Sequence, residues 1–141
     1  MKITLITTGS TADKGPRKVA EYLQKYNHKL EVIFYNENEL RQTLSKCKNT
    51  DLIVVSANVA THKRASLLIQ HLKKLKRPTA YAGIYAALHP EECIKETDLV
   101  ITAKPAETIL ELANRLENFQ RIADIENLRL KFNKKEIIKN A

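Results

Sequence analysis

Short apolar runs alternate with amphipathic stretches along most of this chain. Five of the runs have the length of a β-strand, at residues 3–7, 30–35, 52–56, 79–82 and 99–102. The third and the fifth are mainly continuous apolar segments rather than alternations of apolar and polar positions. Strands that are covered on both faces, as in a parallel sheet, have this pattern. The runs therefore predict a sheet that lies between two layers of helices.

The stretches between these runs carry apolar residues at the spacing of amphipathic helices. Pro16, Pro90 and Pro105 predict the starts of the first, fourth and fifth helices, because proline is favoured in the first helical turn. Asn36 and Glu39 resemble a capping box before the second helix. Five alternating β and α units predict an α/β fold, a doubly wound five-stranded parallel sheet in the flavodoxin-like (Rossmann-like) order 2-1-3-4-5.

The C-terminal end of the chain has a different pattern. Residues 127–132 and 136–138 predict two short strands joined by a turn at residues 133–135, which would form a β-hairpin. We therefore divide the chain into an α/β domain of residues 1–122 and a hairpin or linker of residues 123–141.

Composition favours one globular domain. The chain has 141 residues, of which 43% are hydrophobic and 28% charged, enough for a hydrophobic core. No apolar run reaches the roughly 18 residues that a membrane span needs, and the N-terminal residues lead directly into a strand, so neither a membrane segment nor a signal peptide is expected. Cys47 and Cys93 form no metal-binding or redox motif, so we expect both to be reduced and buried in a cytoplasmic protein.

The net charge of +8 is unevenly distributed. No acidic residue lies between Asp51 and Glu91. A basic surface can attract nucleic acid, a membrane or another anion, but cations near a helix C-terminus are also favoured by the helix dipole. No aromatic residue interleaves these cations, so stacking with bases is not expected and a nucleic-acid partner is disfavoured. The cations in the interval are Lys63, Arg64, Lys73, Lys74, Lys76 and Arg77.

All three glycines, Gly9, Gly15 and Gly83, follow predicted strands at their carboxyl ends. Ligands of open parallel sheets bind at this edge, near the point where the strand order reverses. Glycine permits a close approach to a ligand, although βα turns use glycine in any case, and both interpretations stay open. The side chains there are mostly small and neutral and include no acid–base pair for catalysis. The segments that would form the site are residues 7–14, 56–61, 83–89 and 103–106.

Several known site types do not fit these segments. A phosphoacceptor receiver domain would need acidic residues where residues 7–8 and 56–57 stand. Gly9 and Gly15 do not have the spacing of a dinucleotide-binding motif. His62 and His89 lie on the candidate edge without a second ligand at a recognisable spacing, and His28 and His71 are predicted to be surface residues.

A flavodoxin-like site fits only in part. Residues 8–11, Thr-Gly-Ser-Thr, resemble the hydroxyl-rich loop that binds the phosphate of flavin mononucleotide. Residues 12–15 intervene before the predicted helix, however, and the loop at residues 57–61 has no aromatic side chain on which a flavin ring could stack. A flavin-binding electron-transfer protein remains an alternative.

The stretch TAYAGIYAALHPEECIKETDLVITAKPAETILELANRL, residues 79–116, resembles the cobalamin-binding domain that precedes the catalytic barrel in cobalamin-dependent radical S-adenosylmethionine enzymes. Within it, residues 90–92 (Pro-Glu-Glu), 98–100 (Asp-Leu-Val) and 107–112 match motifs of that family. The likeness extends to residues 15–33, 51–73 and 125–140, which resemble the family's first helix and second strand, its third unit, and the hairpin that leads to the barrel.

Three departures from the family pattern lie in the loops of the predicted site. Ala82 replaces a family glycine, Tyr85 replaces a family histidine, and residues 103–106 (Ala-Lys-Pro-Ala) replace Gly-Glu-Gly-Glu. The Asp-x-His-x-x-Gly motif is absent, so no histidine is expected as lower ligand of the cobalt. The cysteine motif of an iron–sulfur cluster is also absent, so the cluster and S-adenosylmethionine are expected only in a separate or missing barrel domain.

The resemblance implies a cobalamin-binding module that orients the corrinoid for methyl transfer or radical chemistry and is not catalytic alone. Its expected partners are cobalamin and a radical S-adenosylmethionine barrel domain. The alternatives are the flavin-binding protein and a degenerate, ligand-free interaction domain. The residues that the resemblance and the strand ends assign to cofactor binding are Thr7, Thr8, Gly9, Ser10, Lys14, Gly15, Ser56, Ala57, Asn58, Val59, Gly83, Ile84, Tyr85, Ala86, Ala87, Ala103, Lys104 and Pro105.

Overall fold

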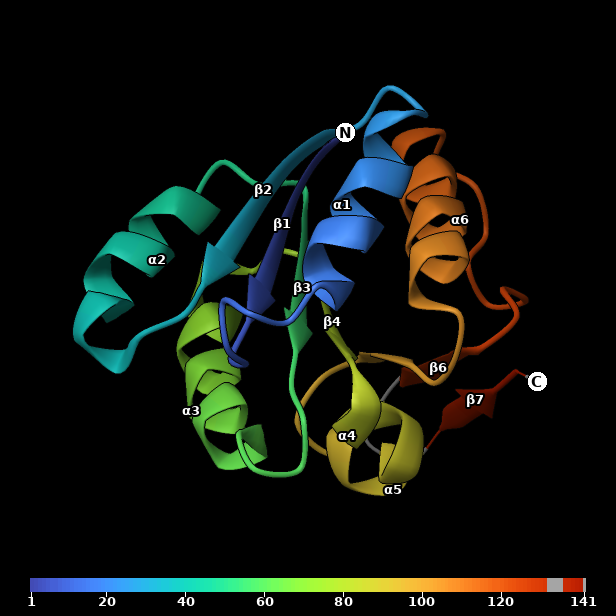
Figure 1. Ribbon diagram of the computed structural model, residues 1–141. Coiled ribbons are helices and arrows are strands. Elements are labelled where there is room, and N and C mark those ends of the chain that lie inside the picture. Colours follow the sequence, from blue (N-terminus) through green and yellow to red (C-terminus); the bar gives the residue numbers. More distant parts are fainter. Residues whose placement is uncertain (132–135, 141) are drawn as a thin grey trace.

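A computed structural model of the chain describes residues 1–131 and 136–140. Within these residues, one sheet contains seven strands in the order β2-β1-β3-β4-β5-β6-β7 (Figure 1). β1 to β5 pair in parallel, whereas β6 is antiparallel to both β5 and β7. The strands are β1 (Lys2–Thr7), β2 (Lys29–Phe34), β3 (Leu52–Ser56), β4 (Thr79–Ala82), β5 (Leu99–Ile101), β6 (Leu128–Lys131) and β7 (Ile137–Lys139).

Helices cover both faces of the sheet. On one face, α1 and α6 contribute buried residues to one core, and on the other, α2, α3, α4 and α5 contribute to a second. The helices are α1 (Gly15–Gln24), α2 (Leu40–Cys47), α3 (His62–Leu72), α4 (Ile84–Leu88), α5 (Pro90–Cys93) and α6 (Pro105–Glu117), with short 3-10 turns η1 (Glu37–Glu39) and η2 (Lys73–Leu75).

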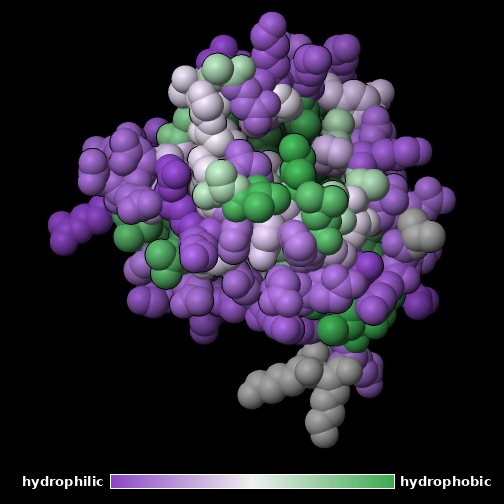
Figure 2. Space-filling view, turned by 60° about the horizontal axis from the view of Figure 1, so that its bottom comes forward, coloured by the Kyte–Doolittle hydropathy of each residue, from purple (hydrophilic) through white to green (hydrophobic). Residues whose placement is uncertain are grey.

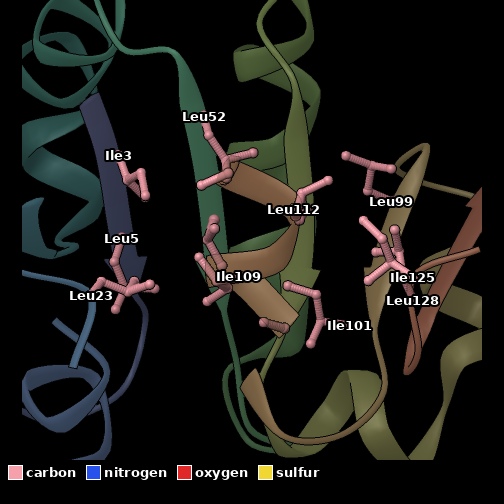
Figure 3. Packing of buried hydrophobic residues seen from close by; sticks show 14 of the residues in the cluster. Ile3, Leu5, Leu23, Leu52, Leu99, Ile101, Ile109, Leu112, Ile125 and Leu128 are labelled. Atoms are coloured by element: carbon pink, nitrogen blue, oxygen red, sulfur yellow. The ribbon is translucent and has the colours of Figure 1, made fainter. Parts of the chain in front are cut away.

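The continuous apolar runs are explained by this arrangement. Side chains alternate between the two faces of a strand, so Leu52 and Val54 of β3 enter the core beneath α1 and α6 (Figure 3), whereas Ile53 and Val55 enter the other core. All four are fully buried. Burial of one such side chain contributes about 1.5–3 kcal/mol, so both faces must be covered for this strand to be stable.

The predicted α/β class with a parallel sheet is confirmed, and β1 to β5 lie in the predicted order 2-1-3-4-5, but in the described residues two further strands extend the sheet beyond the five predicted for it. β6 continues the sheet, with Leu130 opposite Leu99, because Leu128 and Leu130 are buried in the same core as β5. β7 in turn pairs with β6. The turn that we predicted at residues 133–135 lies outside the described residues, and the division of the chain at residue 122 stays a prediction.

Proline lies in the first turn of α1, α5 and α6, as predicted. Residues 84–88, which we predicted as part of a loop, form α4, whose first turn is closed by the Ala87 amide donating to the Gly83 carbonyl. The Asn36 side chain accepts a hydrogen bond from the amide of Asn38 and so starts η1; this is not the expected capping box with Glu39.

The prediction that His28 is a surface residue is wrong. It is buried, and its Nε2 lies 2.8 Å from Oδ1 of Asn114 on α6. Cys47 and Cys93 are buried and unpaired, as expected, and burial raises the pKa of the Cys47 thiol to about 11. Among the described residues, no helix has the length and apolar character needed to cross a membrane.

Candidate functional site

A cavity of about 240 Å³ opens at the carboxyl ends of β1, β3 and β4. The strand order reverses between β1 and β3, which is the position where ligands of doubly wound folds bind. Figure 2 shows this end of the molecule, where apolar side chains gather among polar ones. The cavity is lined by Leu5, Thr7, Gly9, Asp13, Gly15, Pro16, Val19, Ser56, Ala57, Asn58, Ala82, Gly83, Ile84, Pro105 and Ile109.

The cavity has an apolar floor and a polar rim. Leu5, Ala82 and Ile109 are at most 3% exposed and belong to the core between the sheet and helices α1 and α6. Asp13 is exposed, and Asn58 is half-buried. A ligand would therefore insert an apolar group and keep its polar groups near the opening.

Gly83 is required by the packing of two loops. Its φ is +92°, and a Cβ atom there would lie 2.6 Å from Oγ of Ser56 and 2.7 Å from the carbonyl oxygen of Ala57. The amide of Tyr85 also donates to the Ala57 carbonyl at 3.1 Å, so the loop after β4 is held against the loop after β3. The glycine here serves the fold, because only glycine accepts both this backbone conformation and this contact.

Gly9 is different, because a Cβ atom there would meet no close contact. A Cβ there would make only ordinary contacts, at 3.5 Å from Oγ1 of Thr7, 3.7 Å from Oδ2 of Asp13 and 4.0 Å from Nδ2 of Asn58. Gly9 therefore leaves room at the rim for a ligand atom rather than for a packing contact.

The loop after β1 does not form a phosphate cradle. Such a cradle needs several backbone amides that are free to bind an anion. Here the amides of Gly9, Ala12 and Gly15 donate to side chains of the same loop, and those of Thr8 and Asp13 donate to carbonyl groups. The exposed carboxylate of Asp13 would also repel a phosphate at this position. The hydroxyl-rich residues 8–11 thus use their polar groups to hold the loop itself.

A hydrogen-bond network fixes the loop after β3. Oδ1 of Asn58 accepts from the amide of Thr61 at 2.9 Å and from its hydroxyl at 3.0 Å. The Thr61 hydroxyl in turn accepts from the hydroxyl of Thr8 at 2.8 Å, which joins this loop to the loop after β1. The network orients the Asn58 side chain, since its oxygen must face these donors.

Tyr85 lies in an aromatic cluster beside α3, not in the cavity. Its ring stacks on that of His62, with centroids 4.1 Å apart and planes at 9°, and the His89 ring lies 5.1 Å away. Neither histidine lines the cavity. Within the described part of the chain, no group of three or more histidine, cysteine or acidic side chains could hold a metal ion.

The structure brings part of the predicted site together. Thr7, Gly9, Gly15, Ser56, Ala57, Asn58, Gly83, Ile84 and Pro105 line the cavity, whereas Thr8, Ser10, Lys14, Val59, Tyr85, Ala86, Ala87, Ala103 and Lys104 do not.

Sequence reasoning missed six lining residues. The spacing of residues along a strand or a helix could have predicted some of them. Leu5 lies two residues before Thr7 on the same strand face, and Ile109 lies one helical turn after Pro105. The missed residues are Leu5, Pro16, Val19, Ala82 and Ile109, together with Asp13, which lies in the predicted segment 7–14 but was not assigned to cofactor binding.

No protein-family model and no curated protein sequence matches the chain. Among solved structures, it is similar to the radical S-adenosylmethionine methyltransferase TsrM from Kitasatospora setae, with a TM-score of 0.87 and 12% identity over 99% of this chain. It is also similar to OxsB, a cobalamin-dependent S-adenosylmethionine radical enzyme solved with aqua-cobalamin and S-adenosylmethionine bound, with a TM-score of 0.83 and 15% identity over 99% of this chain.

The chain spans 30% of that TsrM chain and 22% of that OxsB chain. Another TsrM structure with a TM-score of 0.82 contains cobalamin and a [4Fe-4S] cluster. The resemblance predicted from the sequence is confirmed at the level of the fold: the structural neighbours of this chain include OxsB, a cobalamin-dependent S-adenosylmethionine radical enzyme, and TsrM, a radical S-adenosylmethionine methyltransferase solved with cobalamin.

Proposed function

We propose that this chain is a cobalamin-binding module and that its cavity receives the nucleotide tail of the cofactor. The observation that carries the proposal is the position and chemistry of the cavity, which has an apolar floor and lies at the reversal point of the sheet. TsrM and OxsB, which share this fold, have been solved with cobalamin or aqua-cobalamin bound.

The size of the cavity favours one arm of a large ligand. Pockets that enclose a whole drug-sized molecule have volumes of about 300–1,000 Å³, and this cavity, at about 240 Å³, is smaller. The aromatic base at the end of the tail would occupy the apolar floor formed by Leu5, Ala82 and Ile109. The corrin ring would lie outside, over the carboxyl ends of the strands, where Val59 and Ile84 are more than half exposed.

The protein's share of the function is binding and orientation. When bound, cobalamin supplies a cobalt centre that can carry an alkyl group, while the protein positions it. Ser56 would contact the tail at the rim, and the packed loops after β3 and β4 would hold its entry point rigid.

A partner barrel domain would supply the rest of the chemistry. Because the chain spans less than a third of TsrM and OxsB, we propose that the iron–sulfur cluster and S-adenosylmethionine bind to a separate or missing domain. The flavin alternative receives no support from the loop after β1, since five of its amides are already engaged within the chain.

A titration with hydroxocobalamin tests the proposal, with visible absorbance and calorimetric heat as readouts. We expect saturable binding by the wild-type chain and none by Gly9→Leu, whose side chain would fill the rim. Gly9 suits this test because its Cβ position is free of close contacts, whereas a Gly83 variant would disturb the fold.

Ser45→Leu, which adds the same side chain at an exposed position on α2, is the matched control and should bind like the wild type. Flavin mononucleotide is the parallel ligand. Binding of the flavin in place of the corrinoid, or of neither cofactor, would refute the proposal, and the second result would favour the degenerate interaction domain.

A further inference from the structure

Asp13 and Asn58 lie at the rim of the cavity. In each side chain, one polar atom accepts a hydrogen bond from its own loop, and the other is available to a ligand. Oδ1 of Asp13 accepts from the amide of Gly15 at 3.0 Å, and Oδ1 of Asn58 accepts from Thr61. In the described part of the chain, no hydrogen bond engages Oδ2 of Asp13 or Nδ2 of Asn58. Both side chains are therefore oriented by the fold and still have one atom for a ligand.

Both remaining atoms lie near Gly9. They lie 3.7 Å (Asp13 Oδ2) and 4.0 Å (Asn58 Nδ2) from the point where a Gly9 Cβ would stand. One small planar group could touch both, since each hydrogen bond adds about 2.9 Å of reach. Because Gly9 has no side chain, it leaves the space between them open.

The chemistry of this pair is specific. A carboxylate oxygen only accepts hydrogen bonds, and an amide nitrogen only donates them. A primary carboxamide offers one donor and one acceptor and so satisfies both. A phosphate or carboxylate would meet the negative charge of Asp13, and an ammonium group would leave Nδ2 of Asn58 unpaired.

We propose that Asp13 and Asn58 form a clamp for a peripheral carboxamide of the corrinoid and that Asp13 disfavours an anionic group in place of that carboxamide. This inference rests on the proposed function, since cobalamin is the ligand whose periphery carries such amides. It assigns to the loops after β1 and β3 a role in selecting the ligand, through Asp13 and Asn58 near Gly9.

Two isosteric variants test the clamp while the loops stay intact. Asp13→Asn keeps the oxygen that binds the Gly15 amide but replaces the free acceptor with a donor. Asn58→Asp keeps the oxygen that binds Thr61 but replaces the free donor with an acceptor. Each should weaken hydroxocobalamin binding about 10-fold, because a hydrogen bond to a charged group is lost in one and a like charge is added in the other.

Asp51→Asn is the matched charge control, because Asp51 accepts a hydrogen bond from the Lys2 amide at the opposite end of the sheet. It should bind hydroxocobalamin like the wild type. Unchanged urea midpoints would show that all three variants remain folded.

A second probe changes the ligand instead of the protein. Monocarboxylates of hydroxocobalamin, in which one peripheral amide is hydrolysed to an acid, place an anion at a known position. At least one isomer should bind about 10-fold more weakly than hydroxocobalamin to the wild type, and Asp13→Asn should restore most of that loss.

The outcomes separate the two proposals. If the wild type does not bind hydroxocobalamin, the proposed function fails and the clamp fails with it. If the wild type binds but both variants bind equally well, or every monocarboxylate binds like the parent compound, the clamp alone is overturned.

Discussion

The loop after β1 and the loop after β4 meet at the same cavity, and each contributes a glycine to it. Gly83, after β4, has a left-handed φ and packs against the backbone of Ala57, so a side chain there has no space. Gly9, after β1, lies in a loop whose hydrogen bonds are mostly local, and a Cβ there would meet nothing closer than 3.5 Å. A glycine beside a cavity can therefore serve either the packing of the fold or the space that a ligand occupies.

The surroundings of the two loops extend this difference. The region around the loop after β4, here called the β4 side, includes Tyr81 and Cys93, which are fully buried next to the short helices α4 and α5. The region around the loop after β1, here called the β1 side, includes exposed residues such as Asp13 and Lys14. We therefore expect stability to depend on the β4 side and ligand selection on the β1 side.

Gly83→Val should show the largest effect on stability. We expect the free energy of unfolding to fall by about 3 kcal/mol or more, because the variant combines an unfavourable φ with a contact of 2.6 Å to Oγ of Ser56. Gly9→Val should change it by less than about 1 kcal/mol. Urea denaturation of both variants measures the contrast, and equal losses at the two positions would contradict the division between scaffold and ligand space.

High pH should destabilise the β4 side through Cys93. Burial, helped by the nearby carboxylates of Glu96 and Glu92, raises the pKa of this thiol to about 12. The unfolded chain releases the thiol proton at a lower pH than the folded chain, so the stabilisation is complete below about pH 8.5 and declines above it. The expected slope is about 1.4 kcal/mol per pH unit between pH 9 and pH 11, for one proton.

Unfolding of the wild type and of Cys93→Ala across this pH range isolates the effect. The variant should be less stable at neutral pH, because it leaves a cavity, but should lose less stability as the pH rises. Parallel pH profiles for the two proteins would show that the Cys93 thiol does not couple to folding. Cys47, with a thiol pKa raised to about 11 by burial, contributes a similar slope in both proteins and so cancels in the comparison.

Tyr81→Phe should show a smaller effect than Gly83→Val. The Tyr81 hydroxyl donates to the carbonyl of His62 at 3.2 Å and lies 3.3 Å from the hydroxyl of Ser66, so it connects β4 to the start of α3. Its removal should cost about 1 kcal/mol of unfolding free energy. Hydroxocobalamin binding should stay unchanged, because Tyr81 does not line the cavity; a large loss of binding would place ligand contacts on the β4 side as well.

Most of the parallel sheet could be predicted, because the sequence patterns of its strands and helices are local. A strand buried on both faces needs a continuous apolar run, as at residues 52–55, and proline in the first turn marks a helix start, as at Pro16 and Pro105. The position of a candidate site at the carboxyl ends of the strands also followed, since the glycines and the small side chains gather there.

Other features depended on contacts between distant segments. His28 looks like a surface residue in its own stretch, but α6 covers it and Asn114 binds it. β6 was expected in a separate hairpin, yet it pairs with β5 of the main sheet, because Leu128 and Leu130 are buried in the same core. The partners, Asn114 for His28 and β5 for β6, lie at least 25 residues away in the sequence, so a local sequence pattern cannot predict these contacts.

The amino-acid pattern alone specifies most of the strands and helices and the residue types at the ends of the strands. Which of those residues share a cavity depends on how the elements pack. Periodicity sets the face on which a side chain lies, whereas a cavity depends on the distances between elements. Gly9 and Gly83 look equivalent along the chain, and only the nearest neighbours of their Cβ positions, at 3.5 Å and 2.6 Å, distinguish a position that has room for a side chain from one that does not.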